Sequence, residues 1–292
     1  MKHLADAHLT IIGTGLMGTS LARALHGKVG ALYGVERSPE ARKIAALHFD
    51  RVTADFSAVA DKTDVVILAA PVRAILKMMD MLKQTAKPNT LILDLGSSKR
   101  KIVAAFDAFP DHLLAVGGHP MAGREVSGPD NASADLYRHC IFVMCPTQRS
   151  TPAALTFVEN LIQAIGARPL TLSAARHDRA VAAISHVPYL ISAALVSAVA
   201  RAAGGDSTVW ELASTGFRDT SRLAGSDPVM MGDTLLTNRE AVIDALALFR
   251  QQLEQIEGIL LSSDEDQLRA ILAVTRQLRL DWFVQWNERQ GK

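Results

Sequence analysis

Three glycines near the start of the chain have the spacing of a phosphate-binding turn. A short apolar run, 9–12, is followed by GTGLMG at 13–18 and then by a segment with helical periodicity. Strand, tight turn and helix in this order are the context in which a G-x-G-x-x-G pattern binds a dinucleotide. Gly13 would allow the turn, Gly15 the approach of a pyrophosphate, and Gly18 the close packing of helix on strand. The alternative is a glycine-rich turn that binds nothing.

An acidic residue follows at the distance that such a cofactor site requires. The first helix offers the N–H groups of Leu16 and Met17 to phosphates, and the run 31–35 predicts a strand that ends at Glu36. An acid about 20 residues beyond the glycines accepts hydrogen bonds from the adenosine ribose of NAD. Arg37 could instead pair with the 2′-phosphate of NADP. We therefore expect NAD, with NADP as the alternative.

Two polar segments come directly after later strand-like runs. DLGSSK at 94–99 places Ser97 where it could hydrogen-bond a substrate or simply cap the following helix. GGHPMAG at 117–123 places His119 in a loop shaped by glycines and a proline. Imidazole titrates at about pH 6.5, so it can accept a hydroxyl proton as hydride leaves the same carbon; a surface or core histidine is the alternative. The cofactor-binding candidates are Gly13, Gly15, Leu16, Met17, Gly18, Glu36, Arg37, Ala70, Pro71 and Ser97.

Two arginines and a histidine in the second half could contact a substrate. The segment STGFRDTSR at 214–222 contains Arg218 and Arg222, and either could be a solvated charge or present a planar fork to a carboxylate. His186 lies two residues before Pro188 in an otherwise apolar helical pattern. The proline lacks an N–H and should kink the helix. His186 could serve a site or only the packing.

The composition is that of a soluble enzyme. Hydrophobic residues make up 49% of the 292, charged residues 21%, and the net charge is +1. We therefore expect neither a nucleic-acid nor a membrane partner. The densest apolar stretch, 187–200, is shorter than a membrane span, and the N-terminus lacks a signal-peptide pattern. Cys140 and Cys145 suggest reduced packing thiols in a cytoplasmic protein without a metal site.

The first part of the chain alternates strand-like and helix-like segments. The predicted strands are 9–12, 31–35, 65–69, 90–94, 113–117, 141–145 and 168–172, with amphipathic segments at 39–48, 73–83 and 151–166. This alternation predicts a mostly parallel, doubly wound sheet whose ligands bind at the carboxyl ends of its strands.

The pattern changes at about residue 173. Long helical patterns cover 174–203, 240–262 and 264–287, and a stretch rich in glycine, serine and proline, 204–233, lies among them. We therefore predict an α/β Rossmann-type domain for dinucleotide binding, 1–172, followed by an all-helical substrate and dimerisation domain, 173–292. Long apolar helices of this kind often pair across a two-fold axis, so we expect a homodimer.

Together the motifs resemble those of the prephenate/arogenate dehydrogenases of tyrosine biosynthesis. The resemblance runs from Gly13 to about Leu260. The motifs, in the family's order, are GTGLMG (13–18), DLGSSK (94–99), HPMAG (119–123), His177-Asp178, SHVP (185–188) and GFRDTSR (216–222).

The resemblance implies a reaction and a role for each matched residue. NAD(P) would take hydride from the hydroxyl-bearing carbon of a cyclohexadienol, prephenate or arogenate, and loss of CO2 would make the ring aromatic. His119 matches the histidine that takes the hydroxyl proton. Ser97 matches the serine that orients this histidine and contacts hydroxyl and nicotinamide. Arg222 matches the arginine that binds a substrate carboxylate, and His186 lies in the substrate-pocket helix.

Two departures from the family's pattern concern the substrate pocket. Many prephenate-preferring members have a histidine where this chain has Tyr189, and several have a tryptophan where it has Met231. The alternatives are a β-hydroxyacid dehydrogenase and a non-catalytic NAD-binding protein. The former resembles this chain at the glycine turn but uses a lysine on the first helix of its second domain, and 176–186 contain no lysine.

Overall fold

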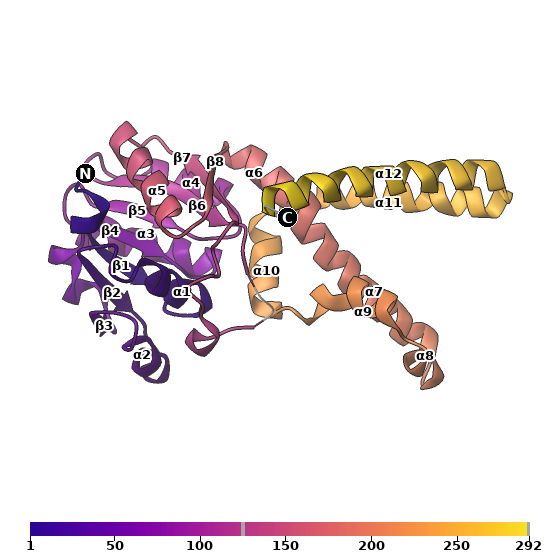
Figure 1. Ribbon diagram of the computed structural model, residues 1–292, viewed down its shortest axis with the longest axis horizontal. Helices are drawn as coiled ribbons and strands as arrows, with labels where there is room; N and C mark the ends of the chain where they lie inside the picture. Colours follow the sequence, from indigo (N-terminus) through magenta and orange to yellow (C-terminus); the bar gives the residue numbers. More distant parts are fainter. Residues whose placement is uncertain (124–125, 291–292) are drawn as a thin grey trace. The chain divides into compact units, whose positions relative to one another are not determined.

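The computed structural model describes residues 1–123 and 126–290, and the chain divides into two compact units, Met1–Arg239 and Glu240–Lys292. The first unit contains the sheet and the shorter helices (Figure 1). The second contains most of α11 (Arg239–Ser262) and α12 (Glu265–Gln290), with Ser263 at a positive φ of 54° between them. The sheet ends near residue 172, where we expected a domain boundary, but the helices that follow pack within the first unit.

The described residues form one eight-stranded sheet in the order β3-β2-β1-β4-β5-β6-β7-β8. All neighbours are parallel except β6 and β7. The strands are β1 (His8–Ile12), β2 (Ala31–Val35), β3 (Arg51–Thr53), β4 (Val65–Leu68), β5 (Leu91–Asp94), β6 (Leu114–Pro120), β7 (Ile141–Pro146) and β8 (Arg168–Thr171). Only β3 was not expected, because it is short and lacks an apolar run. The strand order reverses between β1 and β4, where ligands of such sheets bind.

The inner strands are buried on both faces, as the doubly wound prediction requires. Side chains alternate between two cores: Leu9 and Ile11 of β1 belong to one, and Ile12 belongs to the other. Helices α1 (Leu16–Leu25) and α5 (Pro152–Ala164) contribute to the first core. Helices α3 (Val72–Thr85) and α4 (Arg100–Asp107) contribute to the second. The sheet therefore has helices on both faces (Figure 1), with α2 (Pro39–Ala45) after β2.

Between residue 172 and residue 290, where the structure describes the chain, only helices and helical turns follow the sheet, as expected. They are α6 (Ala174–Val181), a π-helical turn (Ala182–His186), α7 (Val187–Ala203), α8 (Thr208–Glu211), α9 (Thr215–Ser221), a 3₁₀ turn (Arg222–Gly225) and α10 (Pro228–Thr237). The π-helical turn ends two residues before Pro188. A proline cannot supply the usual helical N–H, and π-helical turns are frequent at functional sites.

The helical stretch from Ala174 to Ala203 has the bounds predicted from the sequence. By length and composition this one helix among the described residues could cross a membrane, with a mean hydropathy of 1.6 over its most apolar window. The expectation that no segment spans a membrane considered only the densest apolar part of this helix, 187–200, which is shorter than a membrane span. A core helix of a soluble protein meets the same criteria, so the observation is weak evidence for a membrane.

Candidate active site

The glycine turn has the geometry that each of its glycines was expected to allow. Gly13 has a φ of +97°, and a Cβ there would lie 2.4 Å from the carbonyl oxygen of Ala69, beyond β4. A Cβ on Gly18 would lie 2.0 Å from the carbonyl oxygen of Gly13, so helix α1 packs directly on the turn. A Cβ on Gly15 would meet nothing within 4 Å. The turn is thus packed tightly against the protein backbone at Gly13 and Gly18, and it has open space beside Gly15.

The open side fits a dinucleotide. Gly15 is the N-cap of α1 and no side chain caps that helix, so its first N–H groups are available to a phosphate. Glu36, directly after β2, accepts hydrogen bonds from the backbone N–H of Thr14 at 3.2 Å and of Ser38 at 3.0 Å. These bonds hold its carboxylate beside the turn. Arg37 is exposed, and Ala70 and Pro71 follow β4 at the switch point.

His119 lies in a strand and not in a loop. We expected the strand to end at residue 117, but β6 continues to Pro120 because the antiparallel strand β7 pairs with it, with His119 opposite Val143. Since β6 runs parallel to β5, His119 still lies at the carboxyl edge of the sheet, where β1, β4 and β5 also end. A strand holds the histidine more rigidly than a loop would.

A buried ion pair supports the end of β6. Lys99 and Asp94 are fully buried and form a salt bridge, and the Lys99 ammonium donates a 2.7 Å hydrogen bond to the carbonyl of Gly118. Asp94 accepts a 2.9 Å bond from the N–H of Gly118. A Cβ on Gly118 would lie 2.4 Å from the carbonyl oxygen of Asp94, so only glycine fits there. Burial raises the pKa of Asp94, while the Lys99 ammonium acts in the opposite direction.

A chain of three side chains runs from His119 into the protein. His119 Nδ1 lies 2.8 Å from His177 Nε2, and His177 Nδ1 lies 2.8 Å from Asp178 Oδ1. His177 and Asp178 lie on α6 and are each 1% exposed. The Asp178 carboxylate also accepts backbone N–H bonds of 2.7 Å from Lys99 and 2.9 Å from Arg100, and so caps helix α4. The loop after β5 and the helix α6 are therefore joined beside His119.

Burial makes His119 a neutral group at physiological pH. It lowers the pKa of His119 well below the ordinary histidine value, and His177, Lys99 and His186 act in the same direction. A neutral imidazole has one nitrogen available to accept a proton. His119 can therefore act as a general base near pH 7.

The serines after β5 contact α10. Ser97 Oγ lies 2.8 Å from Thr234 Oγ1, and Ser98 Oγ donates to Thr237 Oγ1 at 2.9 Å. Ser97 is partly exposed at the carboxyl edge, whereas Ser98 is buried. His119 forms its hydrogen bond with His177, so the orienting and substrate-binding roles expected of Ser97 stay a prediction.

The proposed substrate-binding residues differ in exposure. His186 is 2% exposed, and Asn238 Nδ2 lies 3.3 Å from its Nδ1. Burial lowers the pKa of His186 to about 4, so it is neutral. Tyr189 is half-buried at the start of α7, and Met231 is buried on α10.

The two arginines are on the surface of the first unit. Arg218 is exposed on α9, and its Nε donates to Asp219 Oδ1 at 2.8 Å. Arg222 is exposed in the 3₁₀ turn. That turn is attached to α7 by a 3.0 Å bond from the N–H of Ala224 to Ser192 Oγ, one turn along α7 from Tyr189. The turn that holds Arg222 and the start of α7 are thus neighbours.

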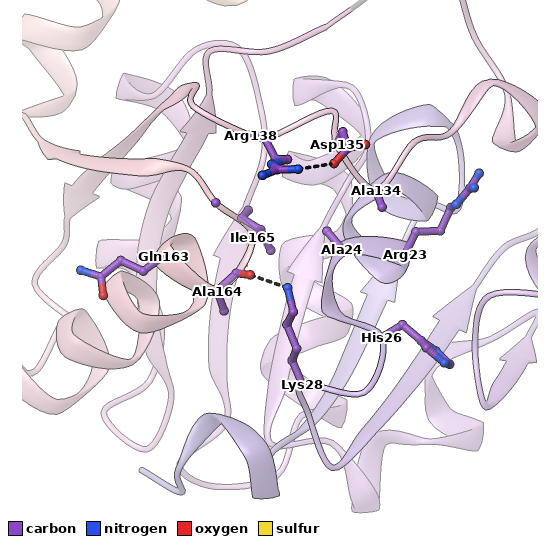
Figure 2. Close-up of a pocket in the computed structure, with 11 residues that line it drawn as sticks. Arg23, Ala24, His26, Lys28, Ala134, Asp135, Arg138, Gln163, Ala164 and Ile165 are labelled. Carbon is purple, nitrogen blue, oxygen red and sulfur yellow. Dashed lines mark hydrogen bonds and ion pairs between the residues drawn. The ribbon is translucent and has the colours of Figure 1, made fainter. Parts of the chain in front are cut away.

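A surface depression elsewhere has a basic lining but no relation to these residues. Figure 2 shows Arg23, Lys28 and Arg138 around it. Lys28 donates to the carbonyl of Ala164 at 2.7 Å, and Arg138 donates to Asp135 at 3.3 Å. Protein groups therefore already engage these cations.

The cysteines behave as packing residues. Cys145 is buried in β7 and Cys140 is partly buried just before it, and both are free thiols. Burial raises the pKa of Cys140 to about 11 and of Cys145 to about 12. Both thiols are protonated near pH 7 and are poor nucleophiles. Among the described residues no group of three or more His, Cys, Asp or Glu side chains could hold a metal ion.

The supporting residues of the site were not predicted from the sequence. His177-Asp178 was expected only as part of a motif, and no role was expected for Asp94, Lys99 or Thr234. A His-Asp pair on a helix that begins the second part of the chain was a usable signal. The contacts of Lys99 and Thr234 had no local signal, because their partners are distant in sequence.

The fold and the site define a class of protein. A Rossmann sheet with a glycine turn, an acid after β2 and a neutral, partly buried histidine at the same edge is the arrangement of an NAD(P)-dependent oxidoreductase. Residues 21–171 match the family model for the prephenate dehydrogenase nucleotide-binding domain, and residues 173–274 match that for the prephenate dehydrogenase dimerization domain. The chain belongs to the prephenate dehydrogenase family.

Individual relatives agree with this assignment. The chain is 30% identical to the cyclohexadienyl dehydrogenase of Zymomonas mobilis over 94% of its own length and 95% of the relative's. It superposes with a TM-score of 0.89 and 28% identity on Aquifex aeolicus prephenate dehydrogenase in complex with hydroxyphenyl propionate and NAD⁺, covering 96% and 99% of the two chains. For Synechocystis arogenate dehydrogenase the TM-score is 0.80 and the identity 30%, with 94% and 99% covered. These matches do not favour the β-hydroxyacid dehydrogenase alternative.

Proposed function

We propose that the protein catalyses the NAD-dependent oxidative decarboxylation of prephenate, L-arogenate or both in tyrosine biosynthesis. The products are 4-hydroxyphenylpyruvate from prephenate and L-tyrosine from arogenate. The observation that carries the proposal is the neutral histidine at the carboxyl edge of a Rossmann sheet, in a chain that belongs to the prephenate dehydrogenase family. Bound NAD supplies the hydride acceptor, and the residues of this chain move the proton and hold the substrate.

His119 acts as the general base. Its free ring nitrogen accepts the proton of the ring hydroxyl while the carbon that bears this hydroxyl gives up hydride. The electron pair of the bond to the ring carboxylate then enters the ring as CO2 leaves, and the oxygen, now phenolic, takes a proton back. Ser97 contacts the hydroxyl and the nicotinamide, and its exposure at the edge beside β5 supports this role.

Arg222 binds a substrate carboxylate. An arginine presents a planar fork that suits a carboxylate, and exposure makes the guanidinium accessible. Arg218 is a second candidate from the same segment, and it pairs with Asp219. His186, Tyr189 and Met231 shape the pocket around the substrate's side chain.

The glycine turn and Glu36 bind the cofactor. Gly13, Gly15, Leu16, Met17 and Gly18 hold the pyrophosphate at the start of α1. Glu36 receives the ribose hydroxyls and repels a 2′-phosphate, whereas exposed Arg37 limits the discrimination against NADP. Ala70 and Pro71 line the cofactor beyond β4.

The enzyme works as a homodimer in the cytoplasm. Residues 173–274 match a dimerization domain, and large apolar side chains are exposed on both long helices, among them Leu248, Leu253, Leu272 and Leu278. Exposed apolar surface of this extent is typical of an interface. Two free thiols are consistent with a reducing compartment.

Steady-state rates of the purified protein with both substrates and both cofactors test the proposal. We expect turnover of prephenate and arogenate, with a larger kcat/KM for NAD than for NADP. Formation of NADH should equal formation of the aromatic product, because one hydride leaves for each CO2 lost. Turnover of neither substrate would contradict the proposed function, and equal or reversed cofactor values would mean that Arg37 and not Glu36 decides the cofactor.

A further inference from the structure

We propose that His177 and Asp178 are positioning residues that fix the tautomer of His119, so that its Nε2 faces the substrate as a bare acceptor. This inference rests on the proposed function, in which His119 is the base. It is carried by two hydrogen bonds in series, His119 Nδ1 to His177 Nε2 and His177 Nδ1 to Asp178 Oδ1, each 2.8 Å long.

The direction of the bond between His177 and Asp178 follows from the charge of Asp178. Burial by itself would raise the pKa of Asp178, but the hydrogen bonds from His177 and from the two backbone N–H groups at the start of α4 lower it below the ordinary value. The carboxylate is therefore ionised and can only accept hydrogen bonds. His177 Nδ1 must then carry the proton and donate it to Asp178.

The direction of the bond between His119 and His177 follows from the position of the proton on His177. A neutral imidazole with its proton on Nδ1 has an unprotonated Nε2. In this proposal His177 is neutral, so that its Nε2 accepts and His119 Nδ1 donates; a doubly protonated His177 would instead donate from Nε2 and give the opposite tautomer of His119. With its own proton on Nδ1, neutral His119 has its lone pair on Nε2, which is the nitrogen not engaged by His177. With His177 neutral, the other tautomer of His119 would place two lone pairs in contact along this partly buried bond.

The same three hydrogen-bonded side chains stabilise the positive charge that forms on His119 during the reaction. When His119 accepts the hydroxyl proton on Nε2, its Nδ1–H continues to donate to His177, which is itself polarised by the Asp178 carboxylate. The logic is that of the acid that orients the histidine in a serine-protease triad. It differs in that a second histidine stands between acid and base.

The charged groups around His119 come from three elements. Asp94 and Lys99 lie at the end of β5 and beyond it and neutralise each other as a salt bridge. His186, on the π-helical turn, is neutral, and burial has lowered its pKa to about 4. Asp178 on α6 is thus the one negative charge that reaches His119 through a hydrogen-bonded partner among these groups.

Two variants test the kinetic consequence. In His177→Phe, Nδ1 of His119 loses its hydrogen-bond acceptor. In Asp178→Asn, the series of three side chains loses the negative charge of its carboxylate. We expect kcat to fall by about 10- to 100-fold in each, as when groups that orient metal-bound histidines are removed, with KM for substrate and NAD within about twofold. His177→Gln should recover part of the loss relative to His177→Phe, because an amide oxygen can accept from Nδ1.

Controls separate positioning from stability. Thr237→Val removes the hydrogen bond from Ser98, which joins the same loop to α10, without touching the histidine chain. Its kcat should stay within about twofold of the wild-type value. In the double variant His119→Asn with His177→Phe, the second change should have no further effect on kcat, because His177 acts through His119.

Nitrogen-15 NMR of the imidazoles tests the tautomer directly and needs no turnover. The chain has nine histidines, and the signals of two are identified by their loss in His119→Asn and His177→Phe. We expect His119 to be protonated on Nδ1 and unprotonated on Nε2. A proton on Nε2 in the wild type, or an equal loss of kcat from His177→Phe in the His119→Asn background, would overturn the inference. Failure of both substrates to react would contradict the proposed function but not this measurement.

Discussion

The two parts of the proposed site are built very differently. The proton-transfer centre, His119, His177 and Asp178, is tied to the protein by hydrogen bonds of 2.7–2.9 Å, and two of its three residues are 1% exposed. The segment with Arg218 and Arg222 consists of short helices, and both arginines are exposed. The first part needs no substrate to take its shape, whereas the second faces solvent.

This difference matches what each part has to do. A general base must hold one orientation and one protonation state before the substrate arrives, which burial and a fixed partner ensure. A carboxylate-binding arginine must stay accessible, because it meets a charged group that arrives from water. Changes in the buried part should therefore affect kcat, and changes in the exposed part should affect kcat/KM through binding.

The largest effect is expected at the base. His119→Asn should lower kcat by about 10²–10⁴-fold, the usual contribution of general acid–base catalysis. The Kd for NAD, measured by fluorescence or calorimetry, should barely change, because the glycine turn and Glu36 are untouched. A near-normal kcat in this variant would show that His119 is not the general base. The buried and exposed parts of the site would then not differ in the way described.

The exposed arginine should show the next largest effect. Arg222→Ala should lower kcat/KM by about 10- to 150-fold, because a hydrogen bond to a charged group contributes about 1.5–3 kcal/mol. Arg222→Lys should recover only part of this, since lysine cannot bind a carboxylate with two parallel bonds. Arg218→Ala is the matched control from the same segment. If it and not Arg222→Ala lowers kcat/KM, the carboxylate is bound by Arg218.

Substrate choice should respond more weakly. Prephenate and arogenate share the ring, hydroxyl and ring carboxylate, and they differ where one ends in a keto acid and the other in an amino acid. Tyr189 is a neutral phenol where many prephenate-preferring relatives have histidine, so we expect arogenate to be accepted and prephenate to remain a substrate. Tyr189→His should shift the ratio of kcat/KM values toward prephenate by about twofold to fivefold, as a partly exposed charge contributes up to about 1 kcal/mol.

A wild-type enzyme that strongly excludes arogenate, together with no shift in Tyr189→His, would show that this position does not contact the side chain. Tyr189→Phe is the control, because it removes the hydroxyl without adding a charge.

The smallest expected effect is that of pH on kcat/KM, which should change little near neutral pH. The base must be unprotonated to react, and burial holds the pKa of His119 well below the ordinary value. Lowering the pH from 8 to about 6.5 should therefore reduce kcat/KM by much less than the half expected of a histidine with an ordinary pKa. The loss should come at lower pH, as His119 becomes protonated. A midpoint at about 6.5 would show that His119 is solvated in the working enzyme.

Much of the fold could be predicted because its signals are local and periodic. The buried strands were found from apolar runs such as Val65–Leu68, and the glycine turn from spacing alone. Strand β3 and the last residues of β6 could not be found in this way. Arg51–Thr53 has no apolar run, and Gly118–Pro120 is a strand because β7 pairs with it.

The sequence by itself determined the order of the elements and the residue types at the carboxyl edge. Ser97, His119 and Glu36 follow strand-like runs, and parallel strands bring their carboxyl ends to one edge. Only the tertiary structure decided which partner orients the base. His119 and His177 are 58 residues apart and Ser97 and Thr234 are 137 apart. A hydrogen bond depends on distances of a few tenths of an ångström between packed elements, and hydrophobic periodicity carries no information at that scale.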